Sequence, residues 1–156
     1  MMVVSDTTAI TTLLKIGEER LLQDQFGGVI VPRAVWNELL AFHSRLPDFV
    51  LLRPVTASDQ RLPGTEALGR GEAEAIKLAK EINADLLLVD DRKASTAAEG
   101  LGIKCTSLLA AIVHAKKDGR LTSVRAAIEL MEGRGGLYLS ESVKAEALRL
   151  AGEDQS

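Results

Sequence analysis

The sequence is poor in the residues that build disulfides, zinc sites and stacking surfaces. Of its 156 residues, one is a cysteine, two are histidines and 3% are aromatic. The lone Cys105 excludes an internal disulfide and a cysteine-rich zinc site, and there are too few rings for successive nucleic-acid bases to stack on. Any chemistry must therefore rest mostly on carboxylates, hydroxyl groups and basic side chains.

Long apolar runs and a strong imbalance of charge are missing as well. No apolar stretch approaches the roughly 18 residues of a membrane span, and no basic-then-apolar leader opens the chain. Nineteen Lys and Arg against 22 Asp and Glu give a net charge of −3, which argues against a protein that coats nucleic acid by bulk charge. We therefore expect a cytoplasmic protein with no membrane partner.

The chain has enough apolar residues for one domain of ordinary size. Hydrophobic residues make up 46% of the sequence and charged residues 26%, as in typical globular proteins. No internal repeat, low-complexity tract or long linker divides it. We expect a single domain over residues 1–156, with helices from about residue 122 packing on the rest.

Short apolar runs alternate with stretches of helical periodicity. Strands are expected at the start of the chain and over 29–31, 85–89 and 103–105, with an extended segment over 49–55. Helices are expected over 8–25, 32–45, 71–83, 92–101, 107–117, 122–132 and 141–151, and 56–69 is the least structured stretch. This alternation predicts an α/β fold with right-handed crossovers and a mostly parallel sheet covered by helices.

Acidic residues follow two of the expected strands. Asp6 comes after the first strand, and Asp90 and Asp91 come after the apolar run 86–89. Ligands of open parallel sheets bind outside the carboxyl ends of the strands, so both places suit a functional site. An aspartate between a strand and a helix is also a good N-cap, and both roles are open for Asp6 and Asp90.

Two glutamates lie on helix faces that bear apolar residues. Glu72 shares its face with Ile76, whereas Glu74 points the other way and is interpreted as a solvated charge. The place of Glu72 in the first turn of its helix also suits the helix dipole. Glu38 shares its face with Val35, and a salt bridge to a neighbouring arginine is the alternative for this carboxylate.

Convergence of these acids would favour a cation. Two carboxylates about 4 Å apart repel by roughly 4 kcal/mol at an effective dielectric constant near 20. Either some of them are protonated or a metal ion neutralises them, and ligand sets of oxygen alone favour Mg²⁺ or Mn²⁺ over zinc. Such a site is suited to the hydrolysis of phosphodiesters.

Four motifs in series resemble the PIN-domain nucleases, in particular the prokaryotic branch related to VapC-type toxins. They are VSDTT at 4–8, VPRAVWNEL at 31–39, GEAEAI at 71–76 and LLVDDR at 87–92. The sequence departs from that branch at 94–96, which hold no arginine, and at 105–107, where Cys-Thr-Ser replaces a Gly-Thr segment.

The resemblance implies a three-layer α/β/α sandwich and a Mg²⁺- or Mn²⁺-dependent endoribonuclease that cleaves single-stranded RNA. It also implies a homodimer and a toxin neutralised by a small antitoxin protein. The catalytic and metal-binding residues that it implies are Asp6, Glu38, Glu72 and Asp90, with Asp91 either as a further ligand or as an acid just outside the ligands. Thr7 or Thr8 would orient a carboxylate or a phosphate. Arg92 and Lys93 adjoin the acids and are expected to contact the RNA backbone.

Two other classes of protein remain as alternatives. One is a non-catalytic PIN-like module that binds a protein partner. The other is a receiver-type phosphoacceptor domain, which also places acids at strand ends. That design requires an acidic pair after the first strand and a lysine after the last, whereas here the pair is Asp90 and Asp91 and the last strand leads into Thr106.

Overall fold

Five short parallel strands form one sheet at the centre of the molecule. The computed structural model describes residues 1–56 and 61–154. The strands are β1 (Val3–Ser5), β2 (Val29–Val31), β3 (Val50–Leu52), β4 (Leu86–Leu88) and β5 (Cys105–Thr106). Their order is β3-β2-β1-β4-β5, and every neighbouring pair is parallel, which confirms the predicted α/β class.

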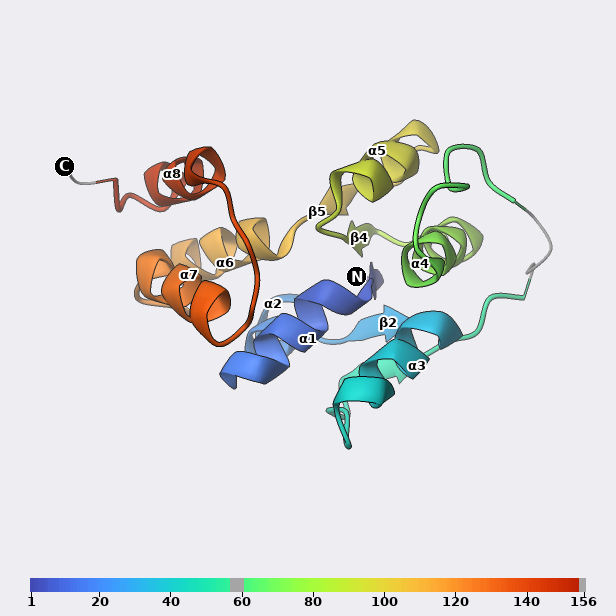
Figure 1. Cartoon of the computed structure of the whole chain (residues 1–156), viewed down its shortest axis with the longest axis horizontal. Helices are drawn as coiled ribbons and strands as arrows, with labels where there is room; N and C mark the ends of the chain where they lie inside the picture. The colour runs from blue at the N-terminus through green and yellow to red at the C-terminus, as the bar shows by residue number, and fades with distance from the viewer. Residues whose placement is uncertain (57–60, 155–156) are drawn as a thin grey trace.

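Helices connect and cover these strands. They are α1 (Thr7–Ile16), α2 (Arg20–Phe26), α3 (Arg33–Phe42), α4 (Arg70–Glu81), α5 (Arg92–Gly100), α6 (Leu108–Lys117), α7 (Val124–Gly133) and α8 (Glu141–Leu150). In Figure 1, α4 lies to the right of the strands and α5 lies above them, whereas α6, α7 and α8 lie to the left. Across the described ranges 1–56 and 61–154, none of the helices has the length and apolar character needed to cross a lipid bilayer.

The side chains of the strands alternate between two apolar cores, one on each face of the sheet. Val3 and Leu88 belong to a core that is completed mainly by α1, α2, α6 and α7. Val4 and Leu87 belong to a second core, formed with α4 and α5. Helices therefore cover both faces, which gives the three-layer α/β/α arrangement.

The helix predicted over 8–25 is two helices in the structure, so that prediction was wrong. Gly17 has a φ of 73°, in the left-handed region that favours glycine, and it ends α1. The N–H groups of Gly17 and Glu18 donate to the carbonyl groups of Leu14 and Leu13, at 3.3 and 2.9 Å. The apolar spacing continues past this break because α1 and α2 bury residues in the same core.

The other predicted elements agree with the observed ones to within a few residues at each end. The extended segment expected over 49–55 contains β3. Of the stretch 56–69, residues 57–60 lie outside the described residues, and 61–69 contain no helix or strand.

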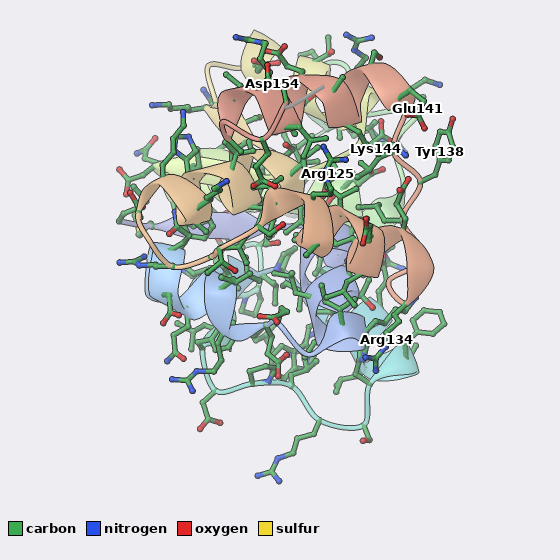
Figure 2. All side chains as sticks on the ribbon, turned by 90° about the vertical axis from the view of Figure 1, so that its left-hand side faces the viewer. Arg125, Arg134, Tyr138, Glu141, Lys144 and Asp154 are labelled. Atoms are coloured by element: carbon green, nitrogen blue, oxygen red, sulfur yellow. The ribbon has the colours of Figure 1, made fainter. Side chains whose placement is uncertain are left out.

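Charged contacts connect the C-terminal helices to each other and to α6. Lys116 Nζ, on α6, and the N–H of Val124, which begins α7, both donate to Glu153 Oε2 at 2.7 Å. Lys144 Nζ, on α8, lies 3.1 Å from Glu132 Oε1 on α7. Figure 2 shows Lys144 on the same side of α8 as Glu141, whose Oε1 lies 3.0 Å from it. The Glu153 carboxylate thus connects the segment after α8 to the end of α6 and to the start of α7.

Candidate acidic active site

The strand order places Asp6 and Asp90 at the same edge of the sheet. β1 and β4 are central neighbours, with Ser5 paired to Leu88, and the N–H of Asp6 donates to the carbonyl group of Leu88 at 3.0 Å. The chain moves from β1 to β2 on one side and reaches β4 on the other side. The carboxyl ends of β1 and β4 therefore form the switch point at which open α/β sheets bind ligands.

Asp6 is a buried carboxylate, 2% exposed. Its Oδ1 has no hydrogen-bond partner among residues 1–56 and 61–154. Burial, followed by the negative charges of Asp90 and Glu72, raises the pKa of Asp6 to about 8. Asp6 stands at the N-cap position of α1, but its side chain makes no cap hydrogen bond. Interactions with the backbone N–H groups of Asp90 and Thr8 oppose the rise in pKa only in part, so helix capping alone does not account for this residue.

Asp90, next to Asp6, is also a largely buried carboxylate with a raised pKa. Its Oδ1 accepts a hydrogen bond from the N–H of Leu108, at the start of α6, at 3.0 Å. Its Oδ2 is buried and has no hydrogen-bond partner in the described part of the chain. Burial raises the pKa of Asp90, and the hydrogen bond from Leu108 opposes that rise in part. Two neighbouring carboxyl groups thus each keep one oxygen that no protein donor satisfies.

Glu38 reaches the same place from α3. The Thr7 hydroxyl, at the start of α1, donates to Glu38 Oε2 at 2.6 Å. Within residues 1–56 and 61–154, the structure shows no ion pair between Glu38 and an arginine. Thr7 therefore orients this carboxylate, and a salt bridge does not.

Glu72, in the first turn of α4, lies between the other acids. Its Oε1 accepts a hydrogen bond from the N–H of Gly69 at 3.2 Å. Burial raises the pKa of Glu72, and so do the charge of Asp91, a hydrogen bond with the Asp91 carboxyl group and the charge of Glu38. Through these interactions, the five acids that the sequence singled out form one continuous cluster.

Asp91 has a structural role as well as its place in the cluster. It is the N-cap of α5, and its Oδ1 accepts a hydrogen bond from the N–H of Lys93 at 2.7 Å. The side chains of Arg92 and Lys93 are exposed at the start of the same helix. Both cations thus border the cluster on its α5 side.

A pocket of about 140 Å³ opens on the cluster. Its lining comes from the starts of α1 and α4 and from α3: Asp6, Thr7, Thr8, Glu38, Gly69, Gly71 and Glu72. Five of the predicted site residues therefore share one small cavity.

Glu74 differs from its interpretation as a solvated charge. Its Oε1 accepts a hydrogen bond from the N–H of Ala34 at 3.0 Å, in the first turn of α3, and its Oε2 lies 3.8 Å from Arg70 Nε. The helical wheel placed it correctly on the side away from Ile76, but that side faces α3. Glu74 therefore attaches α4 to the start of α3.

The donor set suits a hard divalent cation. Carboxylate oxygens are the ligands that Mg²⁺ and Mn²⁺ prefer, and Asp6 and Asp90 each present a buried oxygen without a donor. Within the described part of the chain, no three carboxylate, imidazole or thiol groups already stand in the geometry of a metal site. Asp6, Glu38 and Glu72 line the pocket, whereas Asp90 and Asp91 adjoin these acids outside its lining.

Two contributors to the site carried no clear signal in the sequence. The group that donates to Asp90 is the backbone N–H of Leu108, and the leucine side chain gives no sign that this N–H has such a role. Gly71 lies against the Glu38 carboxyl group, and only its position next to Glu72 could have drawn attention to it.

Comparisons with known proteins relate the chain to a family model and to a solved structure. A solved PilT N-terminus domain protein from the hyperthermophilic archaeon Sulfolobus solfataricus P2 is 18% identical, with a TM-score of 0.49 over 90% of this chain and 99% of the other. The comparison with curated proteins gave no match. A family model described as a PIN domain (DUF3368) matches residues 2–153. PIN domains are generally nucleases and typically use divalent metals. The chain belongs to the PIN-domain family.

Proposed function

We propose that this protein is a Mg²⁺- or Mn²⁺-dependent endoribonuclease that hydrolyses single-stranded RNA, and that it is the toxin of a toxin–antitoxin pair. The observation that carries the proposal is the pair of buried, neighbouring carboxyl groups of Asp6 and Asp90, each with an oxygen that no protein donor satisfies. Such an arrangement lowers the stability of the fold unless a cation completes it.

The acids would hold the ion from several sides. Asp6 and Asp90 would use their free oxygens, Glu38 and Glu72 would act from α3 and α4, and Asp91 would be a further ligand. A bound Mg²⁺ or Mn²⁺ would supply an activated water molecule and neutralise charge on the phosphate. The pKa of Asp6, raised to about 8, keeps a proton on that carboxyl group at neutral pH, and a bound ion would displace it.

The residues around the acids would position the RNA. Thr7 is already engaged in orienting Glu38, whereas the side chain of Thr8 lines the pocket and would orient a phosphate. Arg92 and Lys93, exposed beside Asp91, would contact the backbone phosphates. Contacts of this kind set the position of the strand without reading its sequence.

The proposed partners follow from membership of the PIN family and the resemblance to its VapC-like branch. A homodimer would present two acidic sites, and an antitoxin protein would block them. Because the net charge is −3, attraction of RNA would depend on the local cations at the start of α5 and not on the overall field.

Cleavage of a labelled single-stranded RNA by the purified protein in Mn²⁺ tests the proposal. We expect cleavage that EDTA stops, and a loss of at least about a hundredfold in Asp6→Asn, since removing a metal ligand removes the transition-state charge stabilisation. Asp118→Asn, at an exposed position after α6, is the matched control and should cleave normally.

The possible failures have different meanings. Full activity of Asp6→Asn would contradict the assignment of the site. Absence of both cleavage and Mn²⁺ binding in the unaltered protein would favour the non-catalytic, protein-binding PIN module. If the protein cleaves RNA but an added antitoxin candidate has no effect, the proposed nuclease activity is supported and the proposed toxin role is contradicted.

A further inference from the structure

Gly71 stands where a glycine is unfavourable for the backbone. It is the second residue of α4, with helical backbone angles, and its backbone does not need the conformational freedom of glycine. Alanine is the better helix former at such a position. A glycine there requires another explanation, and its surroundings supply one.

A carboxylate fills the space that a side chain would occupy. A Cβ atom placed on Gly71 would lie 2.6 Å from Glu38 Oε1 and 3.1 Å from both Glu38 Cδ and Oε2. The same addition at Gly69, in the same pocket, would make an ordinary contact of 3.4 Å with Glu72 Oε1. At Gly100, at the end of α5, it would meet no atom within 4 Å.

Glu38 is therefore held between two groups. The Thr7 hydroxyl donates to its Oε2 at 2.6 Å, and the bare Cα of Gly71 admits its Oε1. Together these contacts place the carboxylate against the first turn of α4, where its charge contributes to the raised pKa of Glu72.

We propose that Gly71 is a positioning residue of the acidic site: the absence of its side chain lets the Glu38 carboxylate lie beside Glu72, in reach of the ion. The inference rests on the proposed function for the role of Glu38 as a metal ligand. The close approach of Gly71 and Glu38 does not depend on that role.

The substitution Gly71→Ala should move Glu38 and leave the fold intact. The obstructed atoms are the end of a flexible side chain, so rotation of Glu38 relieves the contact without any shift of α3 or α4. The carboxylate should then leave Thr7 and turn toward solvent, since Glu38 is already exposed on its outer side.

The first test is a crystal structure of metal-free Gly71→Ala, with Gly100→Ala as the matched control. We expect the Thr7 Oγ1 to Glu38 Oε2 distance to exceed hydrogen-bonding range in Gly71→Ala and to stay near 2.6 Å in the control. A Glu38 carboxylate that keeps its bond to Thr7 beside the new methyl group would overturn the inference. This result does not depend on metal binding.

The second test is the Mn²⁺ dissociation constant, measured from free Mn²⁺ by electron paramagnetic resonance, in a double-mutant cycle. We expect Gly71→Ala to weaken binding by about tenfold or more, as loss of a positioning contact typically does. In the Glu38→Ala background, Gly71→Ala should change nothing further.

A loss of the same size in both backgrounds would show that the methyl group acts by another route and would overturn the inference. If the unaltered protein binds no Mn²⁺, the proposed function fails, while the metal-free structure still decides whether Gly71 positions Glu38.

Discussion

Two regions of this molecule treat a carboxylate in opposite ways. Glu153, near the C-terminus, is surrounded by donors: burial raises its pKa, but hydrogen bonds from Lys116 and from the N–H groups of Val124 and Arg125 outweigh that effect and lower the pKa to about 2. Asp6, at the end of β1, has acids as neighbours, and its pKa rises to about 8.

The difference separates a structural carboxylate from a candidate functional one. Donors stabilise the charged form of Glu153, so its charge favours the folded state. At the acidic site, burial and like charges penalise the charged form of Asp6, so its charge disfavours the folded state. The proposed cation would relieve this penalty at the carboxyl edge of the sheet.

The largest expected effect is at Glu153, the carboxylate that is surrounded by hydrogen-bond donors. Glu153→Gln should lower the free energy of unfolding by about 3 kcal/mol, because it removes a charge-assisted hydrogen bond and leaves Lys116 without its carboxylate partner. Urea denaturation at pH 7 measures this change. Glu129→Gln, at an exposed position of α7, is the control, and equal midpoints for the two variants would contradict the structural role of Glu153.

Asp6→Asn should have the opposite sign in metal-free protein. The folded pKa of Asp6, about 8, lies above its ordinary value of 3.8, so the penalty is absent below pH 4, grows as the pH rises to 8 and is constant above that. We expect Asp6→Asn to raise the free energy of unfolding by about 2 kcal/mol at pH 8 and to leave it unchanged near pH 4. This is well below the roughly 6 kcal/mol that the full pKa difference would give, because relaxation of the protein and penetration of water reduce the penalty of a buried charge.

Thermal unfolding in EDTA between pH 3 and 9 measures this profile. The Glu153 contribution has the reverse form: its folded pKa is lowered from 4.5 to about 2, so its stabilisation is present above pH 4.5 and is lost as the pH falls toward 2. If Asp6→Asn is less stable than the unaltered protein at pH 8, the contrast between the two carboxylates is wrong.

Mn²⁺ should stabilise the folded protein only through the acids at the carboxyl ends of β1 and β4. At ten times the dissociation constant, ligand linkage predicts a gain of about 1.4 kcal/mol in the free energy of unfolding, or about 3 °C in Tm. Differential scanning fluorimetry with a Mn²⁺ titration checks this gain. Glu153→Gln should keep the shift and Asp6→Asn should lose most of it; an equal shift in both would place the ion elsewhere.

The smallest expected effect concerns Glu74, a third kind of carboxylate. It accepts a hydrogen bond from Ala34 at the start of α3 and remains partly exposed, so Glu74→Ala should cost about 0.5–1 kcal/mol, as for a lost helix cap. Urea denaturation beside Glu99→Ala, an exposed position of α5, gives the comparison. If Glu74→Ala lowers the free energy of unfolding by more than Glu153→Gln does, the predicted order of these two carboxylates is wrong.

Sequence periodicity predicted most of the fold because helices and strands bury residues at regular intervals. The parallel sheet and most element boundaries followed from it, as did the placing of Asp6 and Asp90 after strands. Periodicity missed the break at Gly17, since α1 and α2 bury residues in one core, and it missed the contact of Glu74 with Ala34, which lies 40 residues away.

The sequence by itself determined which residues bear charge, which helix faces are apolar and where the strands end. These are local properties, set by side-chain chemistry and by the 3.6- and 2-residue periods of the backbone. Only the tertiary structure decided which carboxylates receive donors and which do not. Glu153 meets Lys116, Asp6 meets Asp90 and Glu38 meets Gly71 across long stretches of chain. Burial and neighbouring charge arise from such distant contacts, so the same type of side chain stabilises the fold in one region and destabilises it in another.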